Sequence, residues 1–355
     1  MPKLCVNLAF LPNRPTGLGN YALNLLPHIP AEGITLLSAH QIPGHTCHLV
    51  PDHLSSEHGR WGNLKRLLWS QTQLAGICSR LKSDLLFSPI PEAPLASDCR
   101  FVVTVHDLIP LRFPGPFPSL LTSYFRFFVP EVLRKAEHIL CDSQSTAEDI
   151  IQFYRISEKK ITSIPLAYNA KHFYPHQIKT GNYFLYLGRQ DIYKNLERMI
   201  AAFGLIGNEY EFWIAGPEDS KQTPLLKAQV AQLKLGSRIR FLDYVPFSEL
   251  PALIEGAIAL MFPTLWEGFG LPVLEGMACG TPVITSALSS IPEVAGDAAL
   301  FVDPYCTPAI AEAMAAIAET PNLRSQLRER GLAQVKHFSW EKTGQQTASV
   351  LARYL

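Results

Sequence analysis

The 355-residue sequence has no net charge, because 31 lysines and arginines balance 31 aspartates and glutamates. Proteins that bind nucleic acid through its phosphates normally carry a basic excess, so that class is disfavoured. Charged residues make up only 17% of the chain and hydrophobic residues 47%, which excludes a disordered protein. No apolar run reaches the roughly 18 residues that a membrane-spanning helix requires. A folded chain of about two domains remains.

Cysteine is present but never in a motif. The seven cysteines are scattered, and no two of them form a C-x-x-C pair, so the sequence encodes neither a zinc ribbon nor a thioredoxin-type site. Free thiols are typical of a reducing compartment. The apolar opening Leu4–Leu11 leads into Pro-Asn-Arg-Pro rather than into a small-residue cleavage site. We therefore expect a cytoplasmic protein.

Short apolar runs alternate with longer amphipathic stretches along the whole chain, which predicts parallel α/β sheets. The expected strands are Leu4–Phe10, Ile34–Ala39, Leu85–Ser88, Phe101–Val105, His138–Cys141 and Lys160–Ile164, then Tyr183–Leu187, Glu211–Ala215, Ile239–Leu242, Ala259–Pro263, Pro282–Thr285 and Ala299–Val302. About six strands in each half predict two doubly wound sheets, one in each half of the chain. We expect domains at 1–175 and 176–338, and a C-terminal helix, 339–355, that returns to the first domain.

The strongest motif is W-E-G-F-G-L-P-V-L-E-G-M-A-C-G, Trp266–Gly280. It follows the expected strand Ala259–Pro263 and so lies at a carboxyl end, where open α/β sheets bind ligands. Gly270 and the proline after it predict a helix start whose free N–H groups bind an anion. Glu267 precedes this helix and Glu275 lies about one turn inside it, so the two carboxylates would reach one ligand at different points. The alternative, a surface acid and a helix-dipole partner, is disfavoured by the glycine-rich junction.

A second motif, G-R-Q-D-I-Y-K-N at Gly188–Asn195, directly follows the expected strand Tyr183–Leu187. Arg189 and Lys194 bracket a strand-to-helix turn. A guanidinium binds phosphate oxygens bidentately, and an ammonium adds a compact charge. Seen alone, such a loop is often a solvated basic turn. Since it shares a sheet edge with Glu267, we expect it to bind a diphosphate.

Two patterns in the first half also follow expected strands. T-G-L-G-N-Y at 16–21 resembles a dinucleotide fingerprint, but the acidic residue expected about 20 positions later is missing, which argues against NAD and a dehydrogenase. His106 and Asp107 end the strand Phe101–Val105. A strand-end histidine is often structural, and Asp107 could merely cap the next turn.

Taken together, the second-half motifs resemble retaining glycosyltransferases of family 4, which have the GT-B fold. The matching pieces are G-R-Q-D-I-Y-K-N, A-G-P at 215–217, F-L-D-Y-V at 241–245 and the Glu267–Glu275 segment continuing into G-T-P-V-I-T. The resemblance implies two Rossmann-like, doubly wound α/β domains facing each other across a cleft. In the first half, V-H-D-L-I-P-L-R-F-P resembles bacterial mannosyltransferases of surface-polysaccharide synthesis.

The same resemblance implies roles for individual residues. Arg189 and Lys194 would hold the donor diphosphate, and Glu267 the sugar hydroxyls. His106 would lie beside the donor sugar, which completes the expected catalytic set. The resemblance also implies further donor-binding positions. Gly17 and Gly19 belong to the first-half glycine loop, Tyr244 and Val245 border the nucleobase, and Glu275 contacts the ribose. The backbone around the two second-half motifs contributes Gly188, Gly268, Phe269, Gly270 and Leu271.

The implied reaction moves a hexose from a nucleoside-diphosphate sugar, GDP-mannose or a UDP-hexose, to a sugar or lipid-linked saccharide hydroxyl in polysaccharide or glycolipid synthesis. The family implies a front-face route, and no enzymic nucleophile stands out. No D-x-D triplet occurs, so the sequence requires no metal and no cofactor besides the donor substrate. A glycoside hydrolase would have no use for the two cations. A non-catalytic scaffold or partner subunit of the same fold is the alternative.

Two first-half stretches combine basic and apolar residues. Arg60–Lys82 carries Arg60, Lys65, Arg66, Arg80 and Lys82 and no acid, and 116–135 mixes Phe117, Leu120, Leu121, Tyr124, Phe125, Phe127 and Phe128 with Arg126, Arg134 and Lys135. Two interpretations stay open. These stretches pack on the sheet with a solvated basic face, or they lie on an anionic membrane, which would place the protein peripherally at its inner face. A lipid-linked acceptor favours the second.

Overall fold

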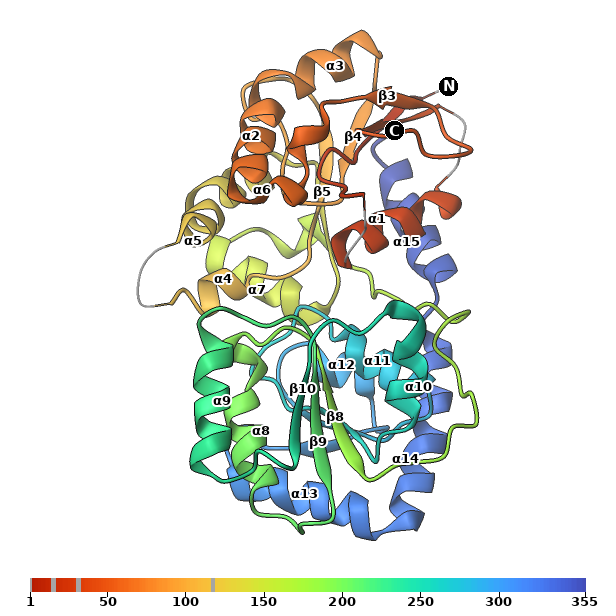
Figure 1. Ribbon diagram of the computed structural model, residues 1–355. Helices are drawn as coiled ribbons and strands as arrows, with labels where there is room; N and C mark the ends of the chain where they lie inside the picture. The colour runs from red at the N-terminus through yellow and green to blue at the C-terminus, as the bar shows by residue number, and fades with distance from the viewer. Residues whose placement is uncertain (1, 14–16, 30–32, 116–118) are drawn as a thin grey trace. The chain divides into compact units, whose positions relative to one another are not determined.

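The computed structural model describes residues 2–13, 17–29, 33–115 and 119–355. The chain forms two compact units, one of residues 1–166 with 340–355 and the other of residues 167–339 (Figure 1). Across the described ranges, no helix combines the length and the apolar character needed to cross a membrane.

The described part of the first unit contains a seven-stranded parallel sheet in the order β3-β2-β1-β4-β5-β6-β7. Its strands are β1 (Leu4–Asn7), β2 (Ile34–Ser38), β3 (Cys47–Leu49), β4 (Leu85–Ser88), β5 (Phe101–Val105), β6 (His138–Cys141) and β7 (Ile161–Ser163). The inner strands are buried on both faces, which explains why they read as continuous apolar runs.

Two details of this sheet differ from the expectation. The edge strand β3 adds to the expected six, because its three half-exposed or exposed residues leave no apolar run. The first strand ends at Asn7 rather than at Phe10. The buried Asn7 amide accepts a hydrogen bond from the backbone N–H of Ala9 (3.2 Å) and donates one to Ser88 Oγ (3.3 Å), which turns the chain out of the ladder.

Helices cover both faces of the first sheet. The pair α1 (Gly17–Leu25) and α15 (Trp340–Ala352) packs together, and the Tyr21 hydroxyl of α1 hydrogen-bonds Thr104 of β5 at 3.1 Å. On the opposite face, Phe101, Val103 and Val105 join one buried cluster with side chains of the remaining large helices. These are α2 (Gly59–Thr72), α3 (Leu74–Arg80), α6 (Val129–Lys135) and α7 (Gln144–Tyr154), accompanied by the short α4 (Ile109–Arg112), α5 (Leu120–Ser123) and a π-helical turn, Tyr124–Phe128.

The second unit contains a six-stranded parallel sheet in the order β10-β9-β8-β11-β12-β13. Its strands are β8 (Tyr183–Leu187), β9 (Glu211–Ala215), β10 (Ile239–Leu242), β11 (Leu260–Phe262), β12 (Val283–Ser286) and β13 (Leu300–Val302). Its helices are α8 (Leu196–Phe203), α9 (Gln222–Gln232), α10 (Leu250–Glu255), α11 (Leu271–Ala278), α12 (Ile291–Ala295), α13 (Thr307–Glu319) and α14 (Pro321–Gln334) (Figure 1).

Each sheet reverses its strand order at one place, between β1 and β4 in the first and between β8 and β11 in the second. Ligands of doubly wound sheets bind at the carboxyl ends of the strands beside this switch point. The loop 188–195 follows β8, and the loop 263–270 follows β11. The two strongest sequence motifs therefore begin at the same switch point.

Candidate active site

Glycines allow the chain ends of β8 and β9 to lie close together at this edge. Gly188 and Gly216 have φ angles of 145° and 141°, and the Gly188 N–H donates to the Ala215 carbonyl at 2.9 Å. A Cβ on Gly216 would lie 2.0 Å from the Gly188 carbonyl oxygen. The glycines of the G-R-Q-D and A-G-P motifs thus have a steric explanation in the fold. The buried Tyr186 hydroxyl donates to the Arg189 carbonyl and fixes the start of the next loop.

Lys194 and Glu267, from the two different motifs, form a bidentate ion pair. The Lys194 Nζ atom lies 2.8 and 2.9 Å from the Glu267 carboxylate oxygens, and the two side chains are only 12% and 9% exposed. The ammonium also lies 5.1 Å from the ring centroid of Phe262. Since the Leu265 N–H donates to the Tyr193 carbonyl at 2.8 Å, the two loops are joined through backbone as well.

Asn195, which the sequence did not single out, holds three strand ends together. Its buried Nδ2 donates to the carbonyls of Pro263 (2.9 Å) and Pro304 (2.8 Å), and its Oδ1 accepts from Arg198 at 2.9 Å. The residue takes a left-handed conformation (φ 64°) at the start of α8, where asparagine is among the better tolerated side chains. Only its position in the motif, before a helix, could have drawn attention to it.

Arg189 lies at the same edge but in a different environment. Its side chain is 73% exposed and lies 3.2 Å from Asp191. An exposed arginine with one surface carboxylate partner keeps most of its donors for a ligand. The two expected cations therefore differ: Lys194 is committed to Glu267, and Arg189 is accessible.

Two serines, Ser289 and Ser290, hydrogen-bond the backbone of the loop before α11. The Ser290 hydroxyl donates to the Phe269 carbonyl at 2.8 Å and shares that proton with the Glu267 carbonyl at 3.1 Å, and the Glu267 N–H donates to Ser289 Oγ at 2.9 Å. Gly270 has a φ of 107°, and a Cβ there would lie 2.7 Å from Ile291 Cδ1. As expected, α11 begins directly after Gly270 with a proline in its first turn. Pro272 has no N–H and the Val273 N–H donates to the Gly270 carbonyl at 3.0 Å, so the Leu271 N–H is the first-turn amide for which the helix itself supplies no acceptor.

Five further residues expected to bind the donor lie in the second unit. Glu275 is inside α11, and burial raises the pKa of its carboxyl to about 7. Tyr244 follows β10 and is 79% exposed, whereas Val245 beside it is half-buried. Gly268 and Leu271 lie in the loop and at the first position of α11. The roles of these residues toward a nucleotide stay predictions.

His106 lies at the carboxyl edge of the first sheet and is held at both ring nitrogens. Nδ1 is 2.7 Å from Asp142 Oδ2, and Nε2 is 2.9 Å from the Pro89 carbonyl. Both partners accept, so this geometry suits the imidazolium. Burial lowers the pKa of His106, but the Asp142 charge and the hydrogen bonds to Asp142 and Pro89 outweigh it, and the pKa is raised. Asp142 directly follows β6 as His106 directly follows β5, and this position after a strand is the signal in the sequence that points to it.

The other first-half candidates have simpler surroundings. Asp107 Oδ1 accepts the Ile109 N–H at 3.0 Å, so this residue caps the next turn. Gly17 is the first residue of α1, and no heavy atom lies within 4 Å of the position that its Cβ would take. Gly19, two residues further along the same helix, is buried. Thr16, which begins this motif, lies outside the described residues.

Comparison with known proteins assigns both halves. Residues 15–172 match the family described as Glycosyltransferase Family 4, and residues 169–334 match Glycosyl transferases group 1. The chain is 32% identical over 266 residues to O-antigen chain mannosyltransferase B of Escherichia coli, covering 70% of this chain and 69% of that protein. It is 34% identical over 203 residues to O-antigen chain mannosyltransferase RfbU of Salmonella typhimurium, covering 57% and 56%.

Solved structures show the same fold over nearly the whole chain. Sucrose-phosphate synthase from Thermosynechococcus elongatus superposes with a TM-score of 0.82 at 19% identity, covering 99% of each chain. Anabaena HepE, solved in complex with UDP and glucose, gives 0.78 at 16% identity, covering 99% of this chain and 100% of that one. The expected fold class is thereby confirmed, and the chain belongs to glycosyltransferase family 4 with the GT-B fold.

Proposed function

We propose that this glycosyltransferase moves a hexose, with mannose as the first candidate, from a nucleoside-diphosphate sugar to a hydroxyl of a saccharide or lipid-linked saccharide, with retention of configuration. The names of the O-antigen relatives support mannose and surface polysaccharide. The UDP complex of a structural neighbour keeps UDP-hexoses among the donors to be tested. The observation that carries the proposal is the Lys194–Glu267 pair beside the start of α11 at the switch point.

The accessible Arg189 and the start of α11, with the Leu271 N–H and the positive end of the helix dipole, supply the field for the diphosphate. Transfer of the sugar leaves a second negative charge on the departing phosphate, and cations and backbone dipoles fixed beforehand stabilise it. The pair with Asp191 is exposed and weak, so the guanidinium can exchange it for phosphate oxygens at little cost.

Glu267 is held for the sugar rather than for the phosphate. An ionised carboxylate offers about four acceptor sites, so Glu267 can accept hydrogen bonds from sugar hydroxyls as well as from Lys194. The two serines and Gly270 fix the backbone on both sides of Glu267, so its carboxylate is held in one orientation. Such fixed geometry favours the distorted, positively charged sugar of the transition state over free donor.

The test is a transfer assay with the purified chain. GDP-mannose and UDP-glucose are offered with mannosides and with a lipid-linked saccharide, and proton NMR reports the anomeric configuration of the product. We expect α-linked product from an α-linked donor. A β-linked product would overturn retention. Nucleotide binding without turnover of any donor would support the non-catalytic alternative.

A further inference from the structure

The loop 89–95 of the first unit is a mostly buried segment that follows β4 and contains three prolines, Pro89, Pro91 and Pro94. Proline has no N–H group, so a stretch of this composition cannot form a regular hydrogen-bond ladder. Its buried carbonyls still need donors, and these have to come from other parts of the fold. The backbone of this loop is therefore shaped by the side chains that contact it.

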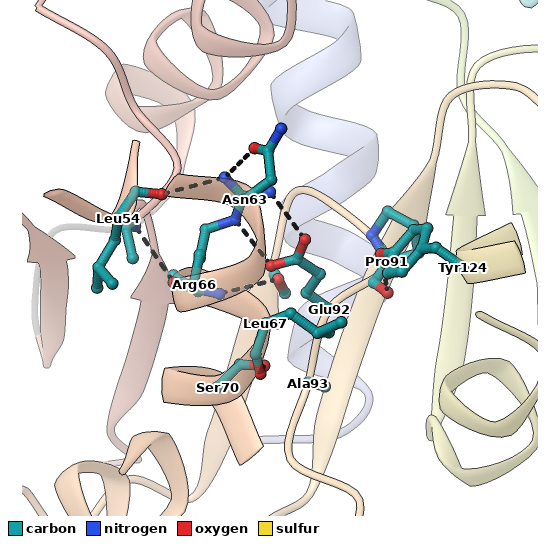
Figure 2. Close-up of polar contacts among 12 residues, drawn as sticks. Leu54, Asn63, Arg66, Leu67, Ser70, Pro91, Glu92, Ala93 and Tyr124 are labelled. Atoms are coloured by element: carbon teal, nitrogen blue, oxygen red, sulfur yellow. Dashed lines mark hydrogen bonds and ion pairs between the residues drawn. The ribbon is translucent and has the colours of Figure 1, made fainter. Parts of the chain in front are cut away.

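Two side chains from outside the loop bind its carbonyls. The Tyr124 hydroxyl of the π-helical turn donates to the Pro91 carbonyl at 2.9 Å (Figure 2). Gln71 of α2 donates from Nε2 to the Ala93 carbonyl at 2.9 Å, and its Oε1 accepts the Leu95 N–H at 3.0 Å. The loop is thus bound on both sides of position 92.

The one charged residue of the loop, Glu92, is bound to α2 by a buried ion pair (Figure 2). Arg66 Nε and Nη2 donate to the Glu92 carboxylate at 2.8 and 2.9 Å. Arg66 Nη1 donates to the Leu54 carbonyl (3.1 Å) and to Asn63 Oδ1 (3.0 Å). The two charged side chains are only 10% and 6% exposed, so water cannot take the place of either partner. Because Trp69 seats α2 in the buried core, the pair ties the loop to a fixed helix.

This arrangement corrects the expectation for Arg66. We expected its side chain on a solvated basic face or at a membrane, yet the residue is only 8% exposed. Tyr124, from the second basic and apolar stretch, likewise packs against the buried cluster. Phe117 and the side chain of Arg60, which belong to the same two stretches, lie outside the described residues. Arg66 and Tyr124 thus serve the interior of the unit.

The first residue of the loop contacts the His106 ring. The Pro89 carbonyl lies 2.9 Å from His106 Nε2, and Asp142 Oδ2 lies 2.7 Å from Nδ1. The Tyr21 ring packs edge-on against the imidazole, with the ring centroids 4.7 Å apart. A ring held by Asp142 alone could turn about that one contact, whereas an acceptor at each nitrogen leaves a single orientation. The place of the Pro89 carbonyl therefore decides how His106 is oriented.

We propose that Arg66 and Glu92 are positioning residues for sugar transfer: they hold the loop 89–95 where its Pro89 carbonyl fixes the His106 ring. The proposal rests on the proposed function in one respect, since it takes His106 to act in the transfer. The state of the ring is measured without donor or acceptor, so failure of this proposal and failure of the proposed function are distinguishable.

The first experiment follows the ring nitrogens of His106 by NMR in the full chain with isotope-labelled histidine. A His106→Gln variant assigns its signals among those of the 11 histidines. The pair variant, Arg66→Met/Glu92→Leu, removes the ion pair without leaving a lone buried charge. We expect it to change the ring-nitrogen shifts and to lower the pKa of His106, because the hydrogen bond to Pro89 raises that pKa and is weakened when the loop is released.

A lower pKa in the pair variant reports on the loop rather than on an altered charge. The charges that act on His106 are those of Asp142 and Asp107, which follow the ends of β6 and β5. Tyr21 of α1 faces the ring as well. The pair variant leaves all three unchanged, so the change in pKa follows from the position of the Pro89 carbonyl.

The matched control is Arg100→Met/Glu137→Leu. It removes an ion pair at the amino edge of the same sheet, where Arg100 precedes β5 and Glu137 precedes β6. We expect this control to keep the wild-type signals and pKa of His106. Wild-type ring signals in the pair variant, or the same change in the pair variant and the control, would overturn the proposal.

The second experiment measures transfer in the assay of the proposed function. We expect kcat of the pair variant to fall by about 10- to 100-fold, with the KM for donor within about twofold of the wild type. In a His106→Ala background, removing the pair should lower kcat no further, because no ring is left to position. A further loss of the same size would show a general loss of structure and overturn the positioning role. An unchanged kcat in a pair variant whose ring signals have changed would overturn it as well.

Two milder variants decide the matter if the pair variant does not fold. Arg66→Lys keeps a charge beside Glu92 but loses the planar fork, and Tyr124→Phe removes only the hydrogen bond to Pro91. We expect both to change the His106 signals in the same direction as the pair variant and to lower kcat by about twofold to tenfold. Wild-type His106 signals in both variants would overturn the proposal.

Discussion

A buried acid–base pair lies at the carboxyl edge of each sheet, yet the surroundings of the two pairs differ. In the second unit, Lys194 holds Glu267, and Arg189 beside them is 73% exposed. In the first unit, His106 has both nitrogens bound, and its Asp142 partner is 4% exposed. The same strand order thus supports an edge with an exposed arginine and another whose groups satisfy each other. The first kind can bind a ligand directly, whereas the second holds an imidazole ring in one orientation.

The largest effect should come from removing Glu267. Glu267→Ala should reduce transfer by about 10³-fold or more, because the sugar loses its fixed acceptor. It also leaves Lys194 without its carboxylate, which should lower the free energy of unfolding by about 1–3 kcal/mol, less than the total stability of a domain. Initial rates and thermal melts measure both. Glu218→Ala, which removes an exposed carboxylate paired with Lys227, is the control. Near-normal turnover in Glu267→Ala would reject this site.

Arg189→Ala separates function from stability. The side chain is largely exposed, so we expect the melting temperature to stay within about 1 °C of the wild type. Transfer should fall by about 10²- to 10³-fold, because the leaving diphosphate loses its accessible cation. The matched control is Arg240→Ala, an arginine 55% exposed and paired with Glu211 in the same unit. A similar loss in both variants would show that general surface charge, not this position, supports catalysis.

At the first-unit edge we expect a smaller effect on rate. His106→Ala should lower kcat by about 10²-fold with little change in the KM for donor. Asp142→Asn should keep the ring in place but lower the pKa of His106, because the opposing charge is gone. If the imidazolium is the working form, activity in this variant falls at a lower pH than in the wild type. An unchanged pH–rate profile would show that Asp142 does not act through His106.

The smallest effect concerns Glu275. Its pKa is raised by burial to about 7 from a reference of 4.5, so the unfolded chain releases the proton first. Stability is therefore highest below pH 4.5 as far as this group is concerned, and declines as pH rises to 7. Glu275→Gln should remove that decline, so its melting temperature should gain on the wild type between pH 5 and 7. A constant difference across that range would contradict the shifted pKa.

Most of the fold could be predicted from sequence, because parallel strands buried on both faces read as apolar runs. Every expected strand has a counterpart, and β3 escaped because its residues are too few and too exposed to form such a run. The motif cations and acids could be located because they directly follow strands. Their partners could not: the contacts of Asn195 and the Ser289–Ser290 pair depend on segments distant in sequence.

The orientation of α2 in the first unit also depends on a contact between segments that are distant in the sequence. Its basic and apolar residues predict a solvated basic face or a membrane contact, and neither interpretation buries Arg66, which is 8% exposed. The buried position follows only from Glu92, 26 residues further on, in a loop after β4. A pairing over that distance is a property of the topology and is not encoded in helical periodicity.

The contrast between the two edges depends on the second one binding the donor diphosphate, and nucleotide-induced stabilisation measures this most directly. Thermal melts of the full chain are compared without ligand and with GDP, UDP, ADP and their sugars. A ligand present at 100 times its Kd stabilises by about 2.7 kcal/mol, or roughly 5–10 °C for a unit of this size. We predict such a shift with at least one nucleotide, GDP first, and its loss in Arg189→Ala. No shift with any nucleotide, or a full shift in Arg189→Ala, would contradict the account.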